Sequence, residues 1–275
     1  LLLMSGKAVL DEGARHASRI ASATGCRLMS NRPTARRQLG AGRPMIDTLA
    51  YPIDISLRQL EKYAHIVLVG TAEPVAFFAY PNKPSRLAPE GCQIDTLVTP
   101  DGDVVGALAA LAEAVGAEDE VDPAACYGYA RPSLPSGALT LDAIWQSVGA
   151  QLPEQAIVVN EAITSGLGAG KWLREIAPYD MLMGTGGAIG HGLPQSVGAA
   201  VACPDRQVVT MQADGSAMYT IQALWTQARE NLNVVTVLFN NRAYQILQGE
   251  FEKVGAEKMG PKVDALFNID RPQLD

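Results

Sequence analysis

Short apolar runs alternate with longer amphipathic segments along the first 120 residues of the chain. Residues 65–70, for example, form an apolar run of the kind that a parallel sheet buries on both faces. Residues 11–24 instead place alanine and isoleucine side chains at helical spacing. The expected strands are residues 1–4, 26–29, 65–70 and 93–98, and the expected helices are residues 11–24 and 104–115. This alternation predicts βαβ units and a parallel sheet.

The same alternation returns after a proline-containing stretch at residues 123–137, which we interpret as an interdomain linker. Thr140 is a favourable N-cap for the first helix of this second half, and Pro194 suits the first turn of a later helix. The expected helices cover residues 141–151, 217–230 and a segment entered at 194, and the expected strands cover residues 156–160, 207–212 and 234–239.

These patterns predict an α/β protein with two Rossmann-like parallel-sheet domains, at residues 1–122 and 138–275. A length of 275 residues is sufficient for two separate cores. The chain begins at Leu1 rather than Met and stops within what we expect to be an unfinished second domain. We therefore expect a fragment of a longer protein, with its second domain incomplete at the C-terminus.

The overall charge is acidic, which argues against two classes of partner. The formal net charge is −7, and an acidic surface does not favour binding to nucleic acid or to anionic membranes. The four cysteines form no Cys-x-x-Cys pair, as expected of reduced thiols in a cytoplasmic protein. No apolar run reaches the roughly 18 residues that a membrane-spanning helix needs.

Candidate chemistry lies at the ends of two successive predicted strands of the second half. An Asp-Gly-Ser motif at residues 214–216 follows one strand, and an Asn-Asn pair at residues 240–241 follows the next. Asp214 and Asn241 are 27 positions apart, enough for one crossover through a helix. Their oxygens suit Mg²⁺, which takes few protein ligands and shares others with phosphates. Taken separately, the aspartate could be only a helix N-cap and the asparagines an ordinary turn.

A glycine-rich segment at residues 184–192 has five glycines in nine positions, which allows its backbone to approach a ligand closely. It is not the dinucleotide fingerprint, because the third glycine of that pattern falls one residue late, at Gly190. Residues 165–172 are not a P-loop, because they begin with serine and end with Trp172 after the lysine. His191 could act as an acid or base, although a loop histidine facing solvent or a neighbouring subunit is commoner.

The order of these features resembles the diphosphate-binding domain of thiamine-diphosphate enzymes, whose signature is Gly-Asp-Gly and, after a helix and a strand, Asn-Asn. The segments ADGSAMYTIQALWTQA and GLPQSVGAAVACPDRQVV are similar to those of family members such as benzoylformate decarboxylase and acetolactate synthase large subunits. The first half resembles the family's central domain. The resemblance thus covers essentially the whole chain, most strongly from residue 184 to residue 247.

The resemblance implies a metal and diphosphate site. The side-chain oxygens of Asp214 and Asn241 and the backbone carbonyl of Ala243 would bind Mg²⁺. The backbone N–H groups of Gly215 and Ser216 would face the diphosphate, so that donors and metal together neutralise its charge.

The resemblance also implies roles around the rest of the cofactor. The Gly187 carbonyl would accept the aminopyrimidine N–H, and Ile189 would hold the cofactor in a bent form that brings its amino group near the thiazolium carbon. Thr164 would offer a hydroxyl to the diphosphate, while Ile246 and Leu247 would face the substrate. The full cofactor-binding set implied is Thr164, Gly186, Gly187, Ala188, Ile189, Asp214, Gly215, Ser216, Asn241, Ala243 and Tyr244.

The chain departs from the family pattern in three ways. Ala213 replaces the first glycine of Gly-Asp-Gly, and Leu247 stands where some family decarboxylases have a proton-transferring glutamate. The family's activating glutamate lies on an N-terminal pyrimidine-binding domain that this chain does not contain, so we assign no catalytic residue. Some acetolactate synthases bind FAD in the central domain. Residues 1–120 contain no glycine-rich loop for it, and we do not expect FAD here.

The implied function is that of a thiamine-diphosphate- and Mg²⁺-dependent enzyme that decarboxylates a 2-oxo acid or joins the product to a second carbonyl compound. Apolar residues at positions 246 and 247 favour an apolar or aromatic substrate. The family resemblance implies a homodimer or homotetramer with the active site at the subunit interface. The alternative is a non-catalytic module of the same fold that binds a nucleotide or a partner. The failed dinucleotide fingerprint argues against a dehydrogenase.

Overall fold

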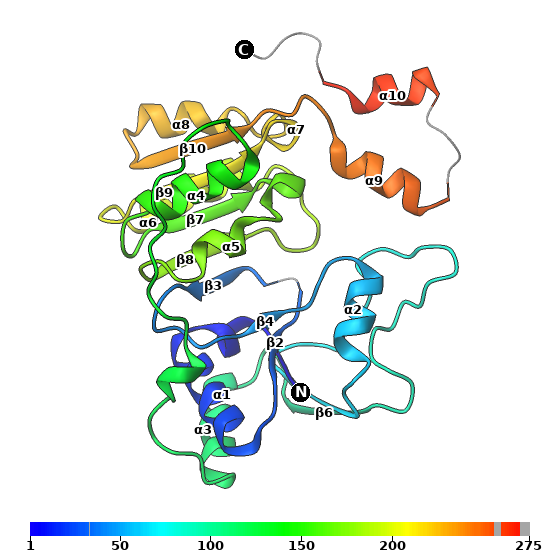
Figure 1. The fold of residues 1–275 in the computed structure, drawn as a ribbon, viewed down its shortest axis with the longest axis vertical. Helices are drawn as coiled ribbons and strands as arrows, with labels where there is room; N and C mark the ends of the chain where they lie inside the picture. Colours follow the sequence, from blue (N-terminus) through cyan, green and yellow to red (C-terminus); the bar gives the residue numbers. More distant parts are fainter. Residues whose placement is uncertain (33, 256–259, 270–275) are drawn as a thin grey trace. The chain divides into compact units, whose positions relative to one another are not determined.

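A computed structural model of the chain describes residues 1–32, 34–255 and 260–269. The chain divides into two compact units, residues 1–129 and 130–275, and the division lies inside the stretch where the sequence predicts a linker. Each unit contains a parallel sheet with helices packed on it (Figure 1). The predicted fold class, two Rossmann-like α/β sheets, is confirmed.

The first unit is built around a five-stranded parallel sheet in the order β4-β2-β1-β5-β6. The strands of this sheet are β1 (Leu2–Met4), β2 (Leu28–Ser30), β4 (Asp47–Thr48), β5 (His65–Val69) and β6 (Gln93–Val98), and a further strand of the unit, β3 (Arg36–Leu39), lies outside this sheet. The helices of the unit are η1 (Gly6–Val9), α1 (Asp11–Thr24), α2 (Ile53–Leu60), α3 (Val104–Ala114) and η2 (Pro123–Ala125). Because side chains alternate along a strand, Leu2 and Met4 pack with α1 and α3, whereas Leu3 packs with α2 on the other face.

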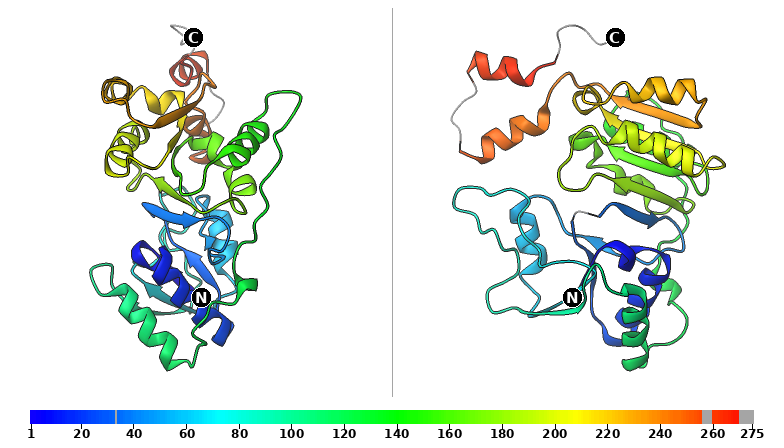
Figure 2. Two further views of the ribbon diagram at one scale, coloured as in Figure 1. Left: turned by 90° about the vertical axis from the view of Figure 1, so that its left-hand side faces the viewer. Right: turned by 180° about the vertical axis from the view of Figure 1, so that it is seen from behind.

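In the second unit, four parallel strands follow the order β10-β9-β7-β8. They are β7 (Ile157–Glu161), β8 (Tyr179–Met183), β9 (Val208–Ala213) and β10 (Val234–Phe239), and the helices are α4 (Leu141–Gln151), η3 (Ile163–Gly166), α5 (Ala169–Leu173), α6 (Gly192–Ala202), α7 (Asp214–Ala217), α8 (Ala223–Arg229), α9 (Gln245–Lys253) and α10 (Pro261–Phe267). Helices α4 and α5 cover one face of this sheet, and α6 and α8 cover the other (Figure 2).

The structure of the second unit differs from the prediction in two places. The single helix expected at residues 217–230 is two helices, α7 and α8. The chain between them forms turns, with hydrogen bonds between residues three positions apart, such as Tyr219 N–H to Ser216 O at 3.2 Å. Strand β8 was not predicted, because Asp180 interrupts its apolar pattern. The buried Asp180 carboxylate is paired with Arg206 Nη2 at 2.6 Å, which makes its burial tolerable.

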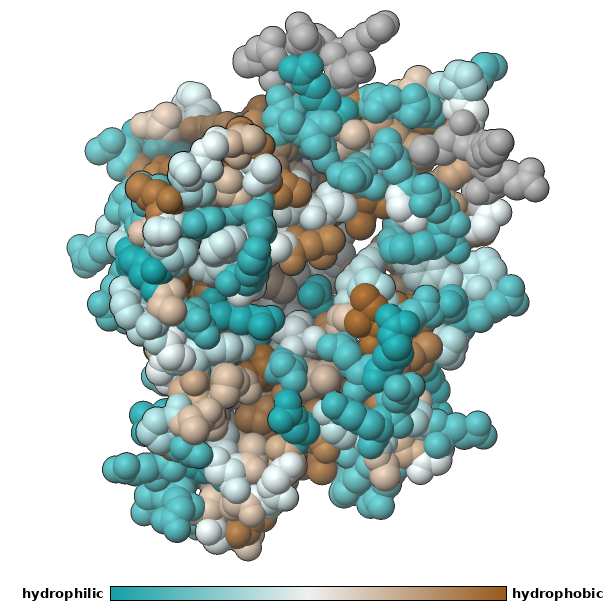
Figure 3. Space-filling model, in the orientation of Figure 1, coloured by the Kyte–Doolittle hydropathy of each residue, from teal (hydrophilic) through white to brown (hydrophobic). Residues whose placement is uncertain are grey.

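No helix among the described residues is long and apolar enough to cross a membrane. On the face shown in Figure 3, apolar side chains occur as patches among hydrophilic ones.

Thr140 begins α4 as the sequence predicts, and its hydroxyl oxygen accepts a hydrogen bond from Ala143 N–H at 3.1 Å. We expect Thr140→Ala to lower the free energy of unfolding by about 1 kcal/mol, because an orphan N–H at the helix start loses its acceptor. Urea-induced unfolding measures this loss. Thr140→Ser keeps the hydroxyl and should keep the stability, so an equal loss in both variants would contradict the cap.

Candidate cofactor and metal site

The carboxyl ends of three parallel strands meet where the sequence places the candidate residues. Ala213 at the end of β9 pairs with Phe239 at the end of β10. On the other side of β9, Gln212 pairs with Glu161 at the end of β7. The segments that begin at positions 162, 214 and 240 therefore start from one edge of the sheet, where open α/β sheets bind ligands.

Asp214 is a buried carboxylate at this edge, with 3% of its surface exposed. Its Oδ1 accepts from Gly215 N–H at 2.8 Å, and its Oδ2 accepts from Arg242 N–H at 2.7 Å. The second bond ties the loop after β10 to the start of α7. Arg242 has a φ of 57°, which is unusual for a non-glycine residue and marks a strained backbone at the site.

Gln245, at the start of α9, connects two of the predicted residues. Its side-chain Oε1 accepts from Asn241 Nδ2 at 3.2 Å and from Thr164 Oγ1 at 3.4 Å. Asn241 Oδ1 in turn accepts from Ala243 N–H at 3.0 Å. The structure thus brings Thr164, Asn241 and Ala243 together, through a glutamine that the sequence analysis missed.

Tyr244 packs against the backbone of Gly215. A Cβ atom added to Gly215 would lie 2.7 Å from Tyr244 Cε1, closer than side chains approach one another. A glycine is therefore required in the Asp-Gly-Ser motif for steric reasons. The ring of Tyr244 and the motif form one packed unit.

The glycine-rich segment exposes the residues that the family resemblance assigns to the cofactor. Gly186 and Gly187 have φ values of 66° and 74°, in the left-handed region that favours glycine. Residues 185–189 are exposed, and Ile189 keeps 45% of its surface accessible. Their backbone and the isoleucine side chain are therefore open to a ligand.

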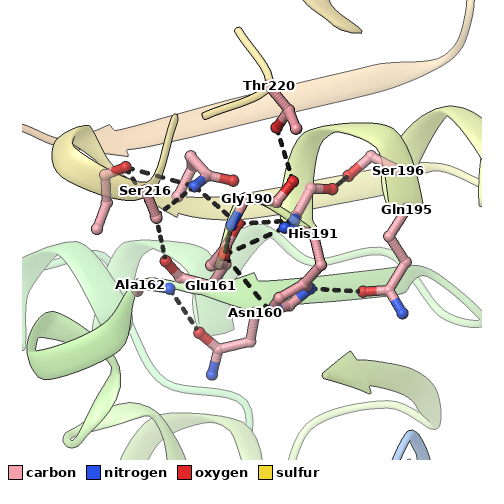
Figure 4. Close-up of polar contacts among 12 residues, drawn as sticks. Asn160, Glu161, Ala162, Gly190, His191, Gln195, Ser196, Ser216 and Thr220 are labelled. Atoms are coloured by element: carbon pink, nitrogen blue, oxygen red, sulfur yellow. Dashed lines mark hydrogen bonds and ion pairs between the residues drawn. The ribbon is translucent and has the colours of Figure 1, made fainter. Parts of the chain in front are cut away.

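Beneath this segment lies Glu161, a second residue that the sequence analysis missed (Figure 4). Its carboxylate accepts from the backbone N–H groups of Gly190 at 2.6 Å, His191 at 3.2 Å and Gly192 at 2.7 Å. It also accepts from Gln212 Nε2 at 3.0 Å. The one signal available in the sequence was an acidic residue at the end of a predicted buried strand.

Ser216 joins the same polar network through its side chain. Its hydroxyl oxygen accepts from Gln212 Nε2 at 2.7 Å and lies 3.1 Å from the carbonyl oxygen of Ala213. The network therefore connects the glycine-rich segment to the Asp-Gly-Ser motif. Ile246 and Leu247 follow Gln245 on α9, where Ile246 is half-buried and Leu247 is 46% exposed.

Residues 165–172, whose sequence is similar to a P-loop, contact helix α4 in the structure. Lys171 Nζ donates to Asp142 Oδ2 at 2.5 Å, and Trp172 Nε1 donates to Asp142 Oδ1 at 3.1 Å. The hydrogen bond from Lys171, and to a smaller extent the hydrogen bond from Trp172, lower the pKa of the Asp142 carboxyl below its ordinary value. The lysine is thus engaged with a helix side chain.

Comparison with known proteins decides the family. A family model described as "Thiamine pyrophosphate enzyme, C-terminal TPP binding domain" matches residues 169–273, which include the glycine-rich segment, Asp214 and Asn241. Over its whole length the chain is 47% identical to IlvX of Mycobacterium tuberculosis, a protein named provisionally as an acetolactate synthase large subunit. The second half of the chain therefore carries the cofactor-binding domain of the thiamine-diphosphate enzyme family.

Two further known proteins are similar over large parts of the chain. Benzoylformate decarboxylase of Pseudomonas aeruginosa is 32% identical over 66% of the chain, which covers 33% of that enzyme. The structure of a thiamine diphosphate-dependent 4-hydroxybenzoylformate decarboxylase from Rhodococcus jostii RHA1 matches 98% of the chain with a TM-score of 0.76 at 24% identity, which supports the fold. The chain spans about half of that enzyme (52%) and of IlvX (53%).

The donor atoms at this candidate site fit Mg²⁺. Among the described residues, no lysine or arginine side chain forms an ion pair with the buried Asp214 carboxylate. A buried anion of this kind is costly until a cation compensates it. The neighbouring Asn241 amide and Ala243 carbonyl supply oxygen ligands of the type that Mg²⁺ prefers. The described ranges contain no cluster of three or more His, Cys, Asp or Glu side chains that could hold a metal ion, so a metal at this site would depend on amide and carbonyl oxygens beside Asp214.

Proposed function

We propose that this chain forms the diphosphate-binding side of the active site of a thiamine-diphosphate- and Mg²⁺-dependent enzyme that acts on a 2-oxo acid. The enzyme would release CO₂ from that acid, or join the product to a second carbonyl compound as an acetolactate synthase does. The observation that carries the proposal is the buried Asp214 carboxylate, which has backbone donors and no cationic side-chain partner among the described residues.

In this proposal, the oxygens of Asp214, Asn241 and Ala243 hold Mg²⁺. Gly215 and Ser216 orient the diphosphate, with Thr164 beside them. The exposed backbone of Gly187 and the side chain of Ile189, with Gly186 and Ala188 on either side, hold the opposite end of the cofactor. When bound, thiamine diphosphate supplies the electron sink for the electron pair that CO₂ leaves behind.

The substrate and the assembly are part of the same proposal. Ile246 and Leu247 are apolar side chains on α9 next to the site, so a 2-oxo acid with an apolar or aromatic side chain is the expected substrate. The relative of this chain from Pseudomonas aeruginosa is named as a decarboxylase of such an acid, benzoylformate. We propose a cytoplasmic homodimer or homotetramer with the site at the subunit interface.

Calorimetric titration of thiamine diphosphate into the whole protein that carries this chain tests the proposal. We expect saturable binding with Mg²⁺ and none after the metal is chelated, because Asp214 and a diphosphate would repel one another without it. Thiamine lacks the diphosphate and should bind in neither condition. Equal binding with and without Mg²⁺ would contradict the metal site, and no binding in either condition would favour the non-catalytic module.

A further inference from the structure

The Glu161 side chain is fully buried, and it accepts hydrogen bonds from three consecutive backbone N–H groups, those of residues 190–192. Hydrogen bonds to an ionised acceptor are shorter and stronger than those between neutral groups. The 2.6 Å and 2.7 Å distances to Gly190 and Gly192 belong to this class. A single carboxylate thus fixes the end of the glycine-rich segment to the end of β7.

The glycines at both ends of this contact are there for steric reasons. A Cβ atom on Gly192 would lie 2.3 Å from Gln212 Oε1 and 2.8 Å from Glu161 Oε2, so any side chain would push the carboxylate away. Gly190 has a φ of 88°, and a Cβ atom there would lie 2.6 Å from Tyr219 Cβ. The backbone of residues 190–192 can therefore approach the Glu161 carboxylate because positions 190 and 192 are glycines.

The segment is held from its other side as well. Thr220 Oγ1 donates to the carbonyl oxygen of Gly190 at 2.7 Å. Gly190 is thus bonded through its N–H to β7 and through its C=O to the turn between α7 and α8. Residues 185–189, immediately before it, stay exposed.

We infer that Glu161 is a positioning residue, which fixes residues 190–192 so that Gly187 and Ile189 present a preformed surface to the cofactor. This inference rests on the proposed function, because it assigns the exposed part of the segment to thiamine diphosphate. A segment already ordered in the free protein loses less conformational entropy on binding, which strengthens binding without adding a contact.

The test compares Glu161→Gln with wild type in the whole protein, using two readouts. Hydrogen–deuterium exchange of peptides spanning residues 184–192 is measured without cofactor, and the Kd for thiamine diphosphate is measured with Mg²⁺. Glutamine keeps the shape but has one acceptor oxygen in place of two and no charge. We expect about tenfold faster exchange and about tenfold weaker binding, the usual effect of losing a charged hydrogen-bond partner.

Two further variants separate the inference from general damage to the fold. Glu154→Gln makes the same change at an exposed glutamate in the same unit and should alter neither readout. Thr220→Val removes the bond to the Gly190 carbonyl without touching the buried carboxylate, and should change both readouts in the same direction by a smaller factor. It therefore keeps the test usable if Glu161→Gln does not fold.

Each result has a distinct meaning. Unchanged exchange in folded Glu161→Gln would overturn the idea that this carboxylate holds the segment. Faster exchange with an unchanged Kd would overturn its role in positioning the cofactor surface. If wild type binds no thiamine diphosphate, the proposed function fails and with it the assignment of the segment to the cofactor, while the exchange data still show whether Glu161 orders the segment.

Discussion

We expect Asp214→Ala to abolish Mg²⁺-dependent binding of thiamine diphosphate. The variant loses the one anionic oxygen ligand of the candidate metal site. It also loses the acceptor of the Arg242 N–H, which holds the loop after β10 in place. Removing one partner of a buried charged interaction costs about 3 kcal/mol or more, which corresponds to a Kd at least about a hundredfold higher. Calorimetric titration with Mg²⁺ measures the change.

A matched control shows whether the effect belongs to the site. Asp205 is an exposed aspartate in the loop between α6 and β9. Asp205→Ala makes the same chemical change away from the carboxyl ends of the strands and should leave the Kd for thiamine diphosphate unchanged. If Asp214→Ala binds the cofactor as tightly as Asp205→Ala does, the metal assignment is wrong and the carboxylate serves only to connect the two loops.

Trp145→Ala should cause the largest loss of stability in the second unit. Trp145 on α4 is fully buried and stacks on Phe239, with ring centroids 5.8 Å apart. Its Nε1–H donates to the carbonyl oxygen of Ser165 at 2.8 Å. We expect the free energy of unfolding to fall by about 3–5 kcal/mol, because the substitution leaves a cavity and an unpaired carbonyl. Urea-induced unfolding measures this change.

Trp225 provides the comparison for that experiment. Its side chain lies on α8 with 64% of its surface exposed. Trp225→Ala removes the same atoms from a site in contact with water, and should change the stability by no more than about 0.5 kcal/mol. Similar losses in both variants would show that α4 does not pack as described.

Several regular elements could be predicted from local sequence alone. β6, β10 and α1 have the bounds that the sequence predicts. β8 was missed because its second residue, Asp180, depends on Arg206, a partner 26 positions away. The break between α7 and α8 was missed for a similar reason, since Thr220 there bonds to Gly190 in another segment.

The residues of the candidate site also divide into those that local sequence could predict and those that it could not. Asp214, Asn241 and the glycine-rich segment could be predicted because their residue types and order form a local pattern. Glu161 and Gln245 could not, because each matters only through hydrogen bonds to residues that are at least four and as many as 81 positions away. Local sequence thus indicates which groups could touch a ligand, whereas the groups that hold them appear only in three dimensions.

The Glu161 carboxylate also has a consequence for the direction in which a ligand enters. Consecutive backbone N–H groups at the start of a helix ordinarily attract anions. At the start of α6 these groups are already saturated by an internal anion. The N–H groups of residues 190–192 are therefore not available to an incoming anion, and residues 185–189 present exposed backbone and an apolar side chain. We expect a molecule with one anionic end and one neutral end to lie with its neutral end on the glycine-rich segment.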